Sequence, residues 1–236
     1  MGAIRRRLTE LMDATVPSVI DADPDVAGWS PDATESYCPR CGASAGPGSV
    51  TPAGCPFCVD QRVSWDRITR LWGYAEPMDA WIKAMKFGRQ WSWGRWLGER
   101  LAERVGEPFA LDRVVVVPVP MPWLRRWRRG FNQAQLMADA LADARGFPCV
   151  PALRRTRHTA PQTSVAASQR EANIRGSLAA HPVDLTGHEV VLVDDVKTTG
   201  ATLAACTRLL KKAGARSVHA AVAAVADPKG QDFKAK

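Results

Sequence analysis

The hydrophobic residues of this chain gather in short runs that do not alternate with polar residues. Three such runs cover residues 114–117, 190–193 and 217–225. A strand buried on both faces, as in a parallel sheet between helices, has this composition because neither face meets water. A further strand or hairpin arm is expected within residues 68–77 and a shorter strand over 149–153. The pattern predicts an α/β fold built on a parallel sheet.

Other stretches repeat their apolar residues at helical spacing. We expect helices over residues 78–87 and 93–105, a third that begins near 130–133, and a fourth after Thr202. A short amphipathic helix is also expected at 4–16. Residues 154–177 show little periodicity, and a stretch of that length inside a compact domain is usually a functional lid or a disordered segment.

Two adjacent carboxylates, Asp194 and Asp195, stand at the carboxyl end of the run 190–193. Open α/β sheets bind ligands at the carboxyl ends of their strands. The turn that follows, Lys-Thr-Thr-Gly-Ala-Thr at 197–202, opens a helix, and backbone N–H groups at such a helix start can hold a phosphate. Carboxylates beside a phosphate cradle fit a sugar phosphate. The alternative is an ordinary strand-turn-helix with a capping acid.

Four of the six cysteines form two Cys-x-x-Cys pairs, Cys38 with Cys41 and Cys55 with Cys58. Two such pairs can present four thiolates in tetrahedral geometry to a soft divalent ion, and zinc fits this set as a structural ion. The stretch between the pairs has too few apolar residues to fold without its metal. Two redox Cys-x-x-Cys motifs are the competing interpretation. The two other cysteines are expected to be core residues rather than nucleophiles.

Composition sets wider limits on the function. The chain has 236 residues, 46% of them hydrophobic, and a formal net charge of +8. The charge suits an anionic partner, either nucleic acid or a pyrophosphorylated substrate. No apolar stretch approaches the roughly 18 residues that span a membrane. The basic N-terminus lacks the apolar core of a secretion signal. We therefore expect a soluble, cytoplasmic protein without membrane insertion. The sequence is compatible with an oligomer but does not determine the oligomeric state.

The segment VVLVDDVKTTGAT, residues 190–202, resembles the signature of type I phosphoribosyltransferases, which bind phosphoribosyl pyrophosphate (PRPP). A four-cysteine module, KFG, VPVP, RGFNQA and REANIRGS surround it in an order that resembles the ComF family of competence-associated, phosphoribosyltransferase-like proteins. This resemblance covers residues 38 to about 226. It implies a type I phosphoribosyltransferase-like parallel sheet flanked by helices, with a small hood region and an N-terminal zinc module of four cysteines.

The resemblance also divides the chain and assigns roles to its residues. The regions are an N-terminal helix and linker (1–36), the zinc module (37–60), a hood or helical region (61–110), the phosphoribosyltransferase-like domain (111–228) and a flexible tail (229–236). Asp194 and Asp195 would contact the ribose hydroxyls, and Arg129 heads the motif that would supply charge to pyrophosphate. Mg²⁺ would arrive with PRPP. The 5′-phosphate would be held by Lys197, Thr198, Thr199, Gly200, Ala201 and Thr202. The loop at Val119, Pro120 and Met121 would bind pyrophosphate, with Arg154, Arg155 and Arg170 as candidates for the leaving group and Gln162 for orientation.

The tryptophans invite a second hypothesis. Five of them, Trp91, Trp93, Trp96, Trp123 and Trp127, are interleaved with arginines. Aromatic residues on a basic groove bind single-stranded nucleic acid without sequence preference, although the same spacing also suits burial inside helices.

Two functions therefore stand. One is a phosphoribosyltransferase that acts on an unidentified base or amine, in nucleotide salvage linked to DNA uptake. The other is a DNA-uptake accessory protein that binds single-stranded DNA and uses its PRPP site for sensing or structure. The sequence names no general base.

Overall fold

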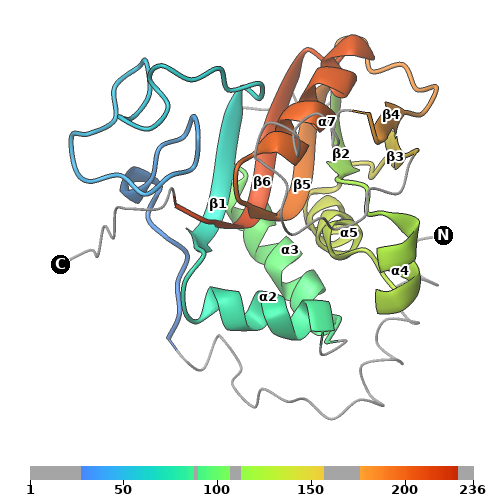
Figure 1. Ribbon diagram of the computed structural model, residues 1–236, viewed down its shortest axis with the longest axis horizontal. Coiled ribbons are helices and arrows are strands. Elements are labelled where there is room, and N and C mark those ends of the chain that lie inside the picture. Colours follow the sequence, from blue (N-terminus) through green and yellow to red (C-terminus); the bar gives the residue numbers. More distant parts are fainter. Residues whose placement is uncertain (1–27, 88–89, 107–112, 157–175, 228–236) are drawn as a thin grey trace.

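The computed structural model describes residues 28–87, 90–106, 113–156 and 176–227. These residues form a main sheet with helices on both faces and a small two-stranded sheet, and the cysteine-rich segment lies beside one edge of the main sheet (Figure 1). The helix expected at 4–16, the tail 229–236 and most of the stretch 154–177, including Gln162 and Arg170, lie outside the described residues.

The main sheet has four strands in the order β1-β6-β5-β2, and every neighbouring pair is parallel. Its strands are β1 (Arg67–Gly73), β2 (Val114–Pro118), β5 (Glu189–Lys197) and β6 (Ser217–Val225). The strands predicted from the three apolar runs are confirmed. Strand β5 is longer than its apolar run, because pairing with β6 continues to Lys197 opposite Val225. The two carboxylates of the signature therefore lie inside the strand.

Successive residues of the central strands enter different cores. Val191 and Val193 of β5 pack in one hydrophobic cluster with α2 (Met78–Phe87), α3 (Ser92–Arg104) and α5 (Gln133–Arg145). Val190 and Leu192 pack in another with α7 (Ala201–Lys212). Figure 1 shows this division, with α2, α3 and α5 on one side of the sheet and α7 on the other. A strand covered on both faces has to be apolar at every position, which explains the unbroken runs.

The remaining elements differ in part from the expectations. The short strand expected at 149–153 is β3 (Leu153–Arg155), which begins later because Cys149 makes only an isolated bridge to Val116. It pairs antiparallel with β4 (Leu178–Ala180). The apolar pattern did not predict α4 (Trp123–Arg129), which follows β2, because this helix is short and exposes its aromatic residues. A 3-10 turn, η1 (Thr34–Ser36), precedes the first cysteine.

The region expected as a hood, 61–110, does not stand apart from the main domain. It contributes β1, which pairs along β6 from Arg67 opposite His219 to Gly73 opposite Val225. It also contributes α3, whose Gly98 lies so close to α5 that an added Cβ would come within 2.4 Å of the Met137 carbonyl oxygen. The described part of this region is therefore built into the same sheet and core as the signature strand.

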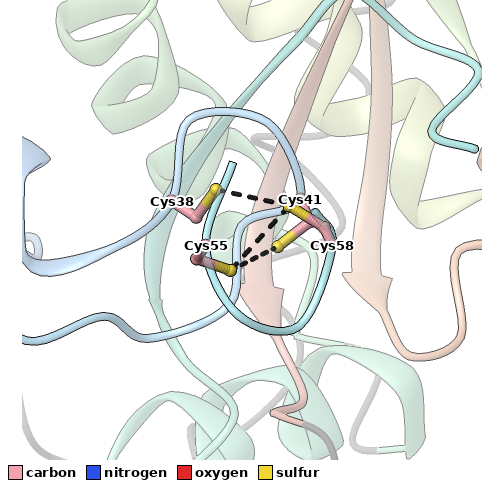
Figure 2. A group of neighbouring side chains, drawn as sticks. All are labelled: Cys38, Cys41, Cys55 and Cys58. Carbon is pink, nitrogen blue, oxygen red and sulfur yellow. Dashed lines mark hydrogen bonds between the residues drawn. The ribbon is translucent and has the colours of Figure 1, made fainter. Parts of the chain in front are cut away.

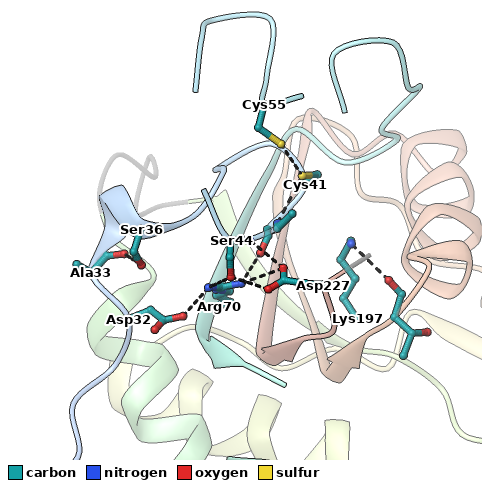
Figure 3. Close-up of polar contacts among 12 residues, drawn as sticks. Asp32, Ala33, Ser36, Cys41, Ser44, Cys55, Arg70, Lys197 and Asp227 are labelled. Carbon is teal, nitrogen blue, oxygen red and sulfur yellow. Dashed lines mark hydrogen bonds and ion pairs between the residues drawn. The ribbon is translucent and has the colours of Figure 1, made fainter. Parts of the chain in front are cut away.

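A buried arginine joins the cysteine module to this sheet. The Arg70 guanidinium, on β1, donates to the Gly42 carbonyl at 2.8 Å and to Ser44 Oγ at 2.9 Å. It forms an ion pair with Asp32 at 2.6 Å and lies 3.8 Å from Asp227, just after β6. Figure 3 shows the guanidinium between these groups. Four segments far apart in the sequence thus meet at one charge.

This arrangement predicts a large cost for removing that charge. Arg70→Met leaves the Asp32 and Asp227 carboxylates without their cation, and breaking a buried pair in this way costs about 3–5 kcal/mol. We expect the free energy of unfolding in urea to fall by that amount. Arg67→Met is the matched control, because Arg67 stands on the same strand but is exposed. Equal stability of the two variants would contradict a structural role for the Arg70 network.

Candidate functional site

The four cysteines of the two pairs come together as the sequence predicted. Their sulfur atoms all lie within 4.8 Å of one another, and all four residues are buried. The Cys38–Cys58 and Cys55–Cys58 sulfur separations are 3.8 Å, and the Cys41–Cys55 separation is 3.6 Å (Figure 2). Four thiolates about 2.3 Å from a central Zn²⁺ at tetrahedral angles are separated by about 3.8 Å. The donor set and its spacing fit a structural zinc ion.

The protonation of these thiols supports the same assignment. Burial raises the pKa of Cys41 and of Cys58. Burial also acts on Cys38, but hydrogen bonds from backbone N–H groups outweigh it and lower the pKa of that thiol. Several thiolates held this close together repel one another, so a divalent cation is needed to keep all four ionised.

The two signature carboxylates point to opposite faces of the sheet. Because side chains alternate along a strand, Asp194 follows Leu192 toward α7, whereas Asp195 follows Val193 toward α2. Asp195 is bound there, since its carboxylate forms an ion pair with Lys86 Nζ at 2.9 Å. The two acids remain adjacent at the backbone, where the Asp195 N–H donates to Asp194 Oδ1 at 2.9 Å.

Asp194 is the titratable group of the site. Burial, together with the neighbouring charge of Asp195, raises the pKa of Asp194 to about 7. The positive charges of Lys86 and Arg155 act in the opposite direction. At neutral pH this carboxyl is therefore poised between its protonated and charged forms, as is common where a group is held for function rather than for stability.

The turn after β5 lines a cavity of about 640 Å³ together with Asp194. All six residues predicted to hold a 5′-phosphate contribute to this cavity: Lys197, Thr198, Thr199, Gly200, Ala201 and Thr202. Gly200 has a φ of 79° and precedes α7, so the backbone reaches the helix start through a left-handed residue. The structure therefore places the predicted phosphate turn and the first predicted ribose ligand in one hollow at a helix N-terminus.

The far wall of this cavity comes from the segment that follows the fourth cysteine. Trp65 lies against the turn, and a Cβ at Gly200 would come within 2.8 Å of its ring. Trp65 Nε1 in turn donates to the Arg40 carbonyl at 2.9 Å, between the first two cysteines. The cysteine module thus supports the phosphate turn. Sequence reasoning missed Trp65, because nothing in the pattern of residues links it to a turn more than 130 positions away.

The loop after β2 does not share that cavity. Pro120, Met121 and Arg154 line a second cavity of about 220 Å³. Val119 is fixed beside the signature strand, since its N–H donates to the Val193 carbonyl at 2.9 Å and its own carbonyl accepts from Asn132 Nδ2 at 3.1 Å. The predicted pyrophosphate residues that the structure describes therefore lie at the β2 edge of the sheet, in a hollow separate from that of the phosphate turn.

Two arginines approach the carboxylates from opposite faces. Arg155 donates to the Ser177 hydroxyl at 2.9 Å and to the Pro120 carbonyl at 3.3 Å, and its charge acts on Asp194. Burial lowers the pKa of Arg129, while Asp195 raises it. Arg129 also lies over the Phe87 ring at 5.2 Å. The predictions for Arg129 and Arg155 thus each have a partner at the site. Lys86, the partner of Asp195, was not predicted from the sequence.

The aromatic residues of the proposed nucleic-acid surface do not form one surface. Trp93 stacks on Trp81 at 5.0 Å between ring centroids, and Trp96 packs on Trp29 at 5.2 Å, both inside a tryptophan cluster of the core. Trp91 packs on Phe131 at 5.1 Å. These ring contacts favour the packing interpretation for these three tryptophans. Helical spacing had left both interpretations open.

If the fold depends on zinc, removing one cysteine ligand should remove the ion and lower the stability of the protein. Metal analysis of the purified protein should find a single Zn²⁺ per chain, and Cys55→Ser should lose the ion and lower the melting temperature by roughly 10 °C or more. Cys149→Ser is the control, since Cys149 lies outside the four-sulfur group. Zinc retained by Cys55→Ser, or lost equally from the control, would contradict the assignment.

In the described part of the chain, no helix combines the length and apolar character needed to cross a bilayer.

Comparisons with known proteins agree with this geometry. The phosphoribosyl transferase domain family matches residues 97–236, more than half of the chain. Competence protein F of Haemophilus influenzae is 32% identical over 190 residues, which are 78% of this chain and 82% of that protein. DNA utilization protein YhgH of Escherichia coli K12 is 34% identical over 195 residues, with the same two shares of 78% and 82%.

Among solved structures, the glutamine PRPP amidotransferase from B. subtilis aligns at 27% identity with a TM-score of 0.38, over 55% of this chain and 25% of that one. The family match and the two relatives, which cover most of both sequences, confirm the resemblance found in the signature and cysteine motifs. The chain belongs to the phosphoribosyl transferase domain family and, within it, to the ComF family.

Proposed function

We propose that this protein binds PRPP with Mg²⁺ and transfers its 5-phosphoribosyl group to a base or amine, with release of pyrophosphate. The observation that carries the proposal is the shared cavity of Asp194 and the turn at 197–202. A carboxylate that accepts from sugar hydroxyls and a row of backbone N–H groups at a helix start are the two features that a sugar 5-phosphate requires.

Each part of the site has a task in this reaction. Asp194 accepts hydrogen bonds from the ribose hydroxyls, and the turn holds the 5′-phosphate. The acceptor's lone pair forms the new bond to the anomeric carbon, while the bond from that carbon to pyrophosphate breaks and its electron pair leaves with pyrophosphate. Bound Mg²⁺ would neutralise the charge on the leaving group.

The β2 edge is suited to the pyrophosphate side of this reaction. Its cavity is lined by Arg154, Arg155 and Arg126, which can pair with phosphate oxygens. Arg129 would add its charge from the other face. Gln162 and Arg170 remain candidates of the same kind within the stretch 154–177. Preorganised positive charge at the departing group is the main source of rate in such transfers.

The biological setting follows from the relatives. One relative is named as a competence protein and the other as a DNA utilization protein. We therefore assign the protein to nucleotide salvage linked to DNA uptake. Four buried cysteines held as a metal site rather than as disulfides suit the reducing cytoplasm.

A second candidate function is binding of single-stranded DNA, and α4 is the element that favours it. Trp123 and Trp127 of this helix are 64% and 77% exposed, and Phe87 nearby is 74% exposed. Arg125 and Arg126 are exposed on the same helix. Exposed rings among cations offer both stacking and phosphate pairing to an unpaired strand.

The first test is calorimetric titration with PRPP and Mg²⁺. We expect Asp194→Asn to weaken PRPP binding roughly 10- to 100-fold, because the amide cannot replace a charged acceptor of two hydroxyl hydrogen bonds. Asp143→Asn is the control, since this exposed carboxylate lies on α5 away from the cavity. No binding by the zinc-loaded wild type would refute the proposed function.

The pH dependence adds a signature of Asp194. Its raised pKa means that the carboxyl is largely protonated at about pH 6 and largely charged at about pH 8. Wild-type affinity should therefore rise across this window, after which it levels off. The Asp194→Asn variant removes this component and keeps only the contribution from the ionisation of PRPP itself, so two identical pH profiles would contradict the role of Asp194.

The DNA hypothesis is tested on α4. Fluorescence anisotropy with a labelled oligo(dT) strand should show binding that weakens with salt. The double variant Trp123→Ala/Trp127→Ala should lose about 10-fold or more in affinity, at roughly 1–3 kcal/mol per stacked base, while PRPP binding and the melting temperature stay unchanged. An unaltered DNA affinity would exclude α4 as the contact surface.

A further inference from the structure

The cavity at the signature extends beyond what a ribose and its 5′-phosphate need. From Asp194 it continues across the turn 197–202 and along the first two turns of α7, to Ala204 and Arg208. On this side it is closed by residues 61–65, which follow the fourth cysteine. Its volume of about 640 Å³ lies in the range of pockets that enclose a whole small-molecule ligand.

This outer half of the cavity is positively charged. Arg62 and Arg208 line it from two different elements, and Arg208 Nη1 lies 3.5 Å from Ser64 Oγ. The nearby carboxylate of Asp66 does not neutralise them, because it pairs with Lys211 at 2.8 Å and accepts the Val218 N–H at 2.7 Å. Two guanidinium groups and a hydroxyl thus face a hollow that continues directly from the phosphate turn.

The positions of the lining residues on their elements suggest the ligand. Asp194 lies in β5 before the phosphate turn, whereas Arg208 stands about two helical turns into α7 beyond it, on the same cavity lining as Arg62. A ligand that follows this order has a second anionic group attached to its 5′-phosphate, on the side away from the sugar. Pyrophosphate leaving from the anomeric carbon is directed elsewhere, toward the β2 edge.

Resting on the proposed function, we propose that the site accepts ribose 5-diphosphate esters, in which a second phosphate joined to the 5′-phosphate is bound by Arg62, Arg208 and the Ser64 hydroxyl. The residues of the segment after the cysteine module are therefore specificity residues of the sugar-phosphate site. A guanidinium can pair with two oxygens of one phosphate, so the two arginines suffice to hold the second phosphate.

ADP-ribose and ribose 5-phosphate form the matched probes. Both carry a ribose with free hydroxyls and a 5′-phosphate, and ADP-ribose adds the second phosphate and an adenosine. In calorimetric titrations we expect ADP-ribose to bind about 10- to 100-fold more tightly than ribose 5-phosphate. Hydrogen bonds between the arginines and a charged phosphate contribute an affinity gain of this size. AMP, which has the adenosine and one phosphate, should bind more weakly than ADP-ribose.

The variant Arg62→Gln/Arg208→Gln should reduce the affinity for ADP-ribose to that for ribose 5-phosphate. Its affinity for ribose 5-phosphate should stay within a factor of about three of the wild-type value. Arg216→Gln is the matched control, because Arg216 is 69% exposed and lies outside the cavity lining. Zinc content and melting temperature verify folding. If the double variant fails to fold, Arg62→Gln alone, at an exposed position, should show part of the same selective loss.

The outcomes separate this inference from the proposed function. Equal affinities for ADP-ribose and ribose 5-phosphate, or an ADP-ribose preference that survives in the arginine variant, overturn the second phosphate site. The proposed function stands in either case if ribose 5-phosphate binds and Asp194→Asn weakens it. Failure of both ligands and of PRPP to bind overturns the two together.

Discussion

The buried charge of Arg70 is the constraint on which the site depends. A guanidinium that is 3% exposed needs partners for its charge and its donors. The structure provides them from the segment before the first cysteine, from the residues just after the first cysteine pair and from the residue that follows the end of β6 by two positions. These partners hold the cysteine module against β1. The segment 61–65 leaves the module at a defined place as a result, and there it closes the cavity over the phosphate turn.

The alternation of side chains along β5 has a similar consequence for the chemistry. Two adjacent carboxylates would repel each other most strongly if both faced one cavity. The strand places them on opposite faces, where Lys86 pairs with Asp195 and leaves Asp194 in the cavity with a pKa raised to about 7. One acid is thus neutralised by an ion pair, and the other is available to titrate and to bind.

Burial also separates two roles that one residue type plays in this chain. The tryptophans that contact α2 and α3 fill the core, where large rings contribute most through buried area and ring contacts. Those of α4 stay exposed beside arginines. Members of one aromatic set are therefore divided between core packing and an exposed helix, and only their surroundings distinguish them.

The sequence by itself determined the strands and helices of the core and the local chemistry, but not the exposed helix α4. Unbroken apolar runs identified the strands, because burial on both faces leaves no room for polar side chains. The four cysteines and the turn 197–202 were recognisable because the residues of each motif lie close together in the sequence. The tertiary structure alone decided which distant residues meet them. Lys86, Trp65 and Arg208 reach the site through strand order, side-chain alternation and the Arg70 network. These are long-range constraints, and no spacing along the chain records them.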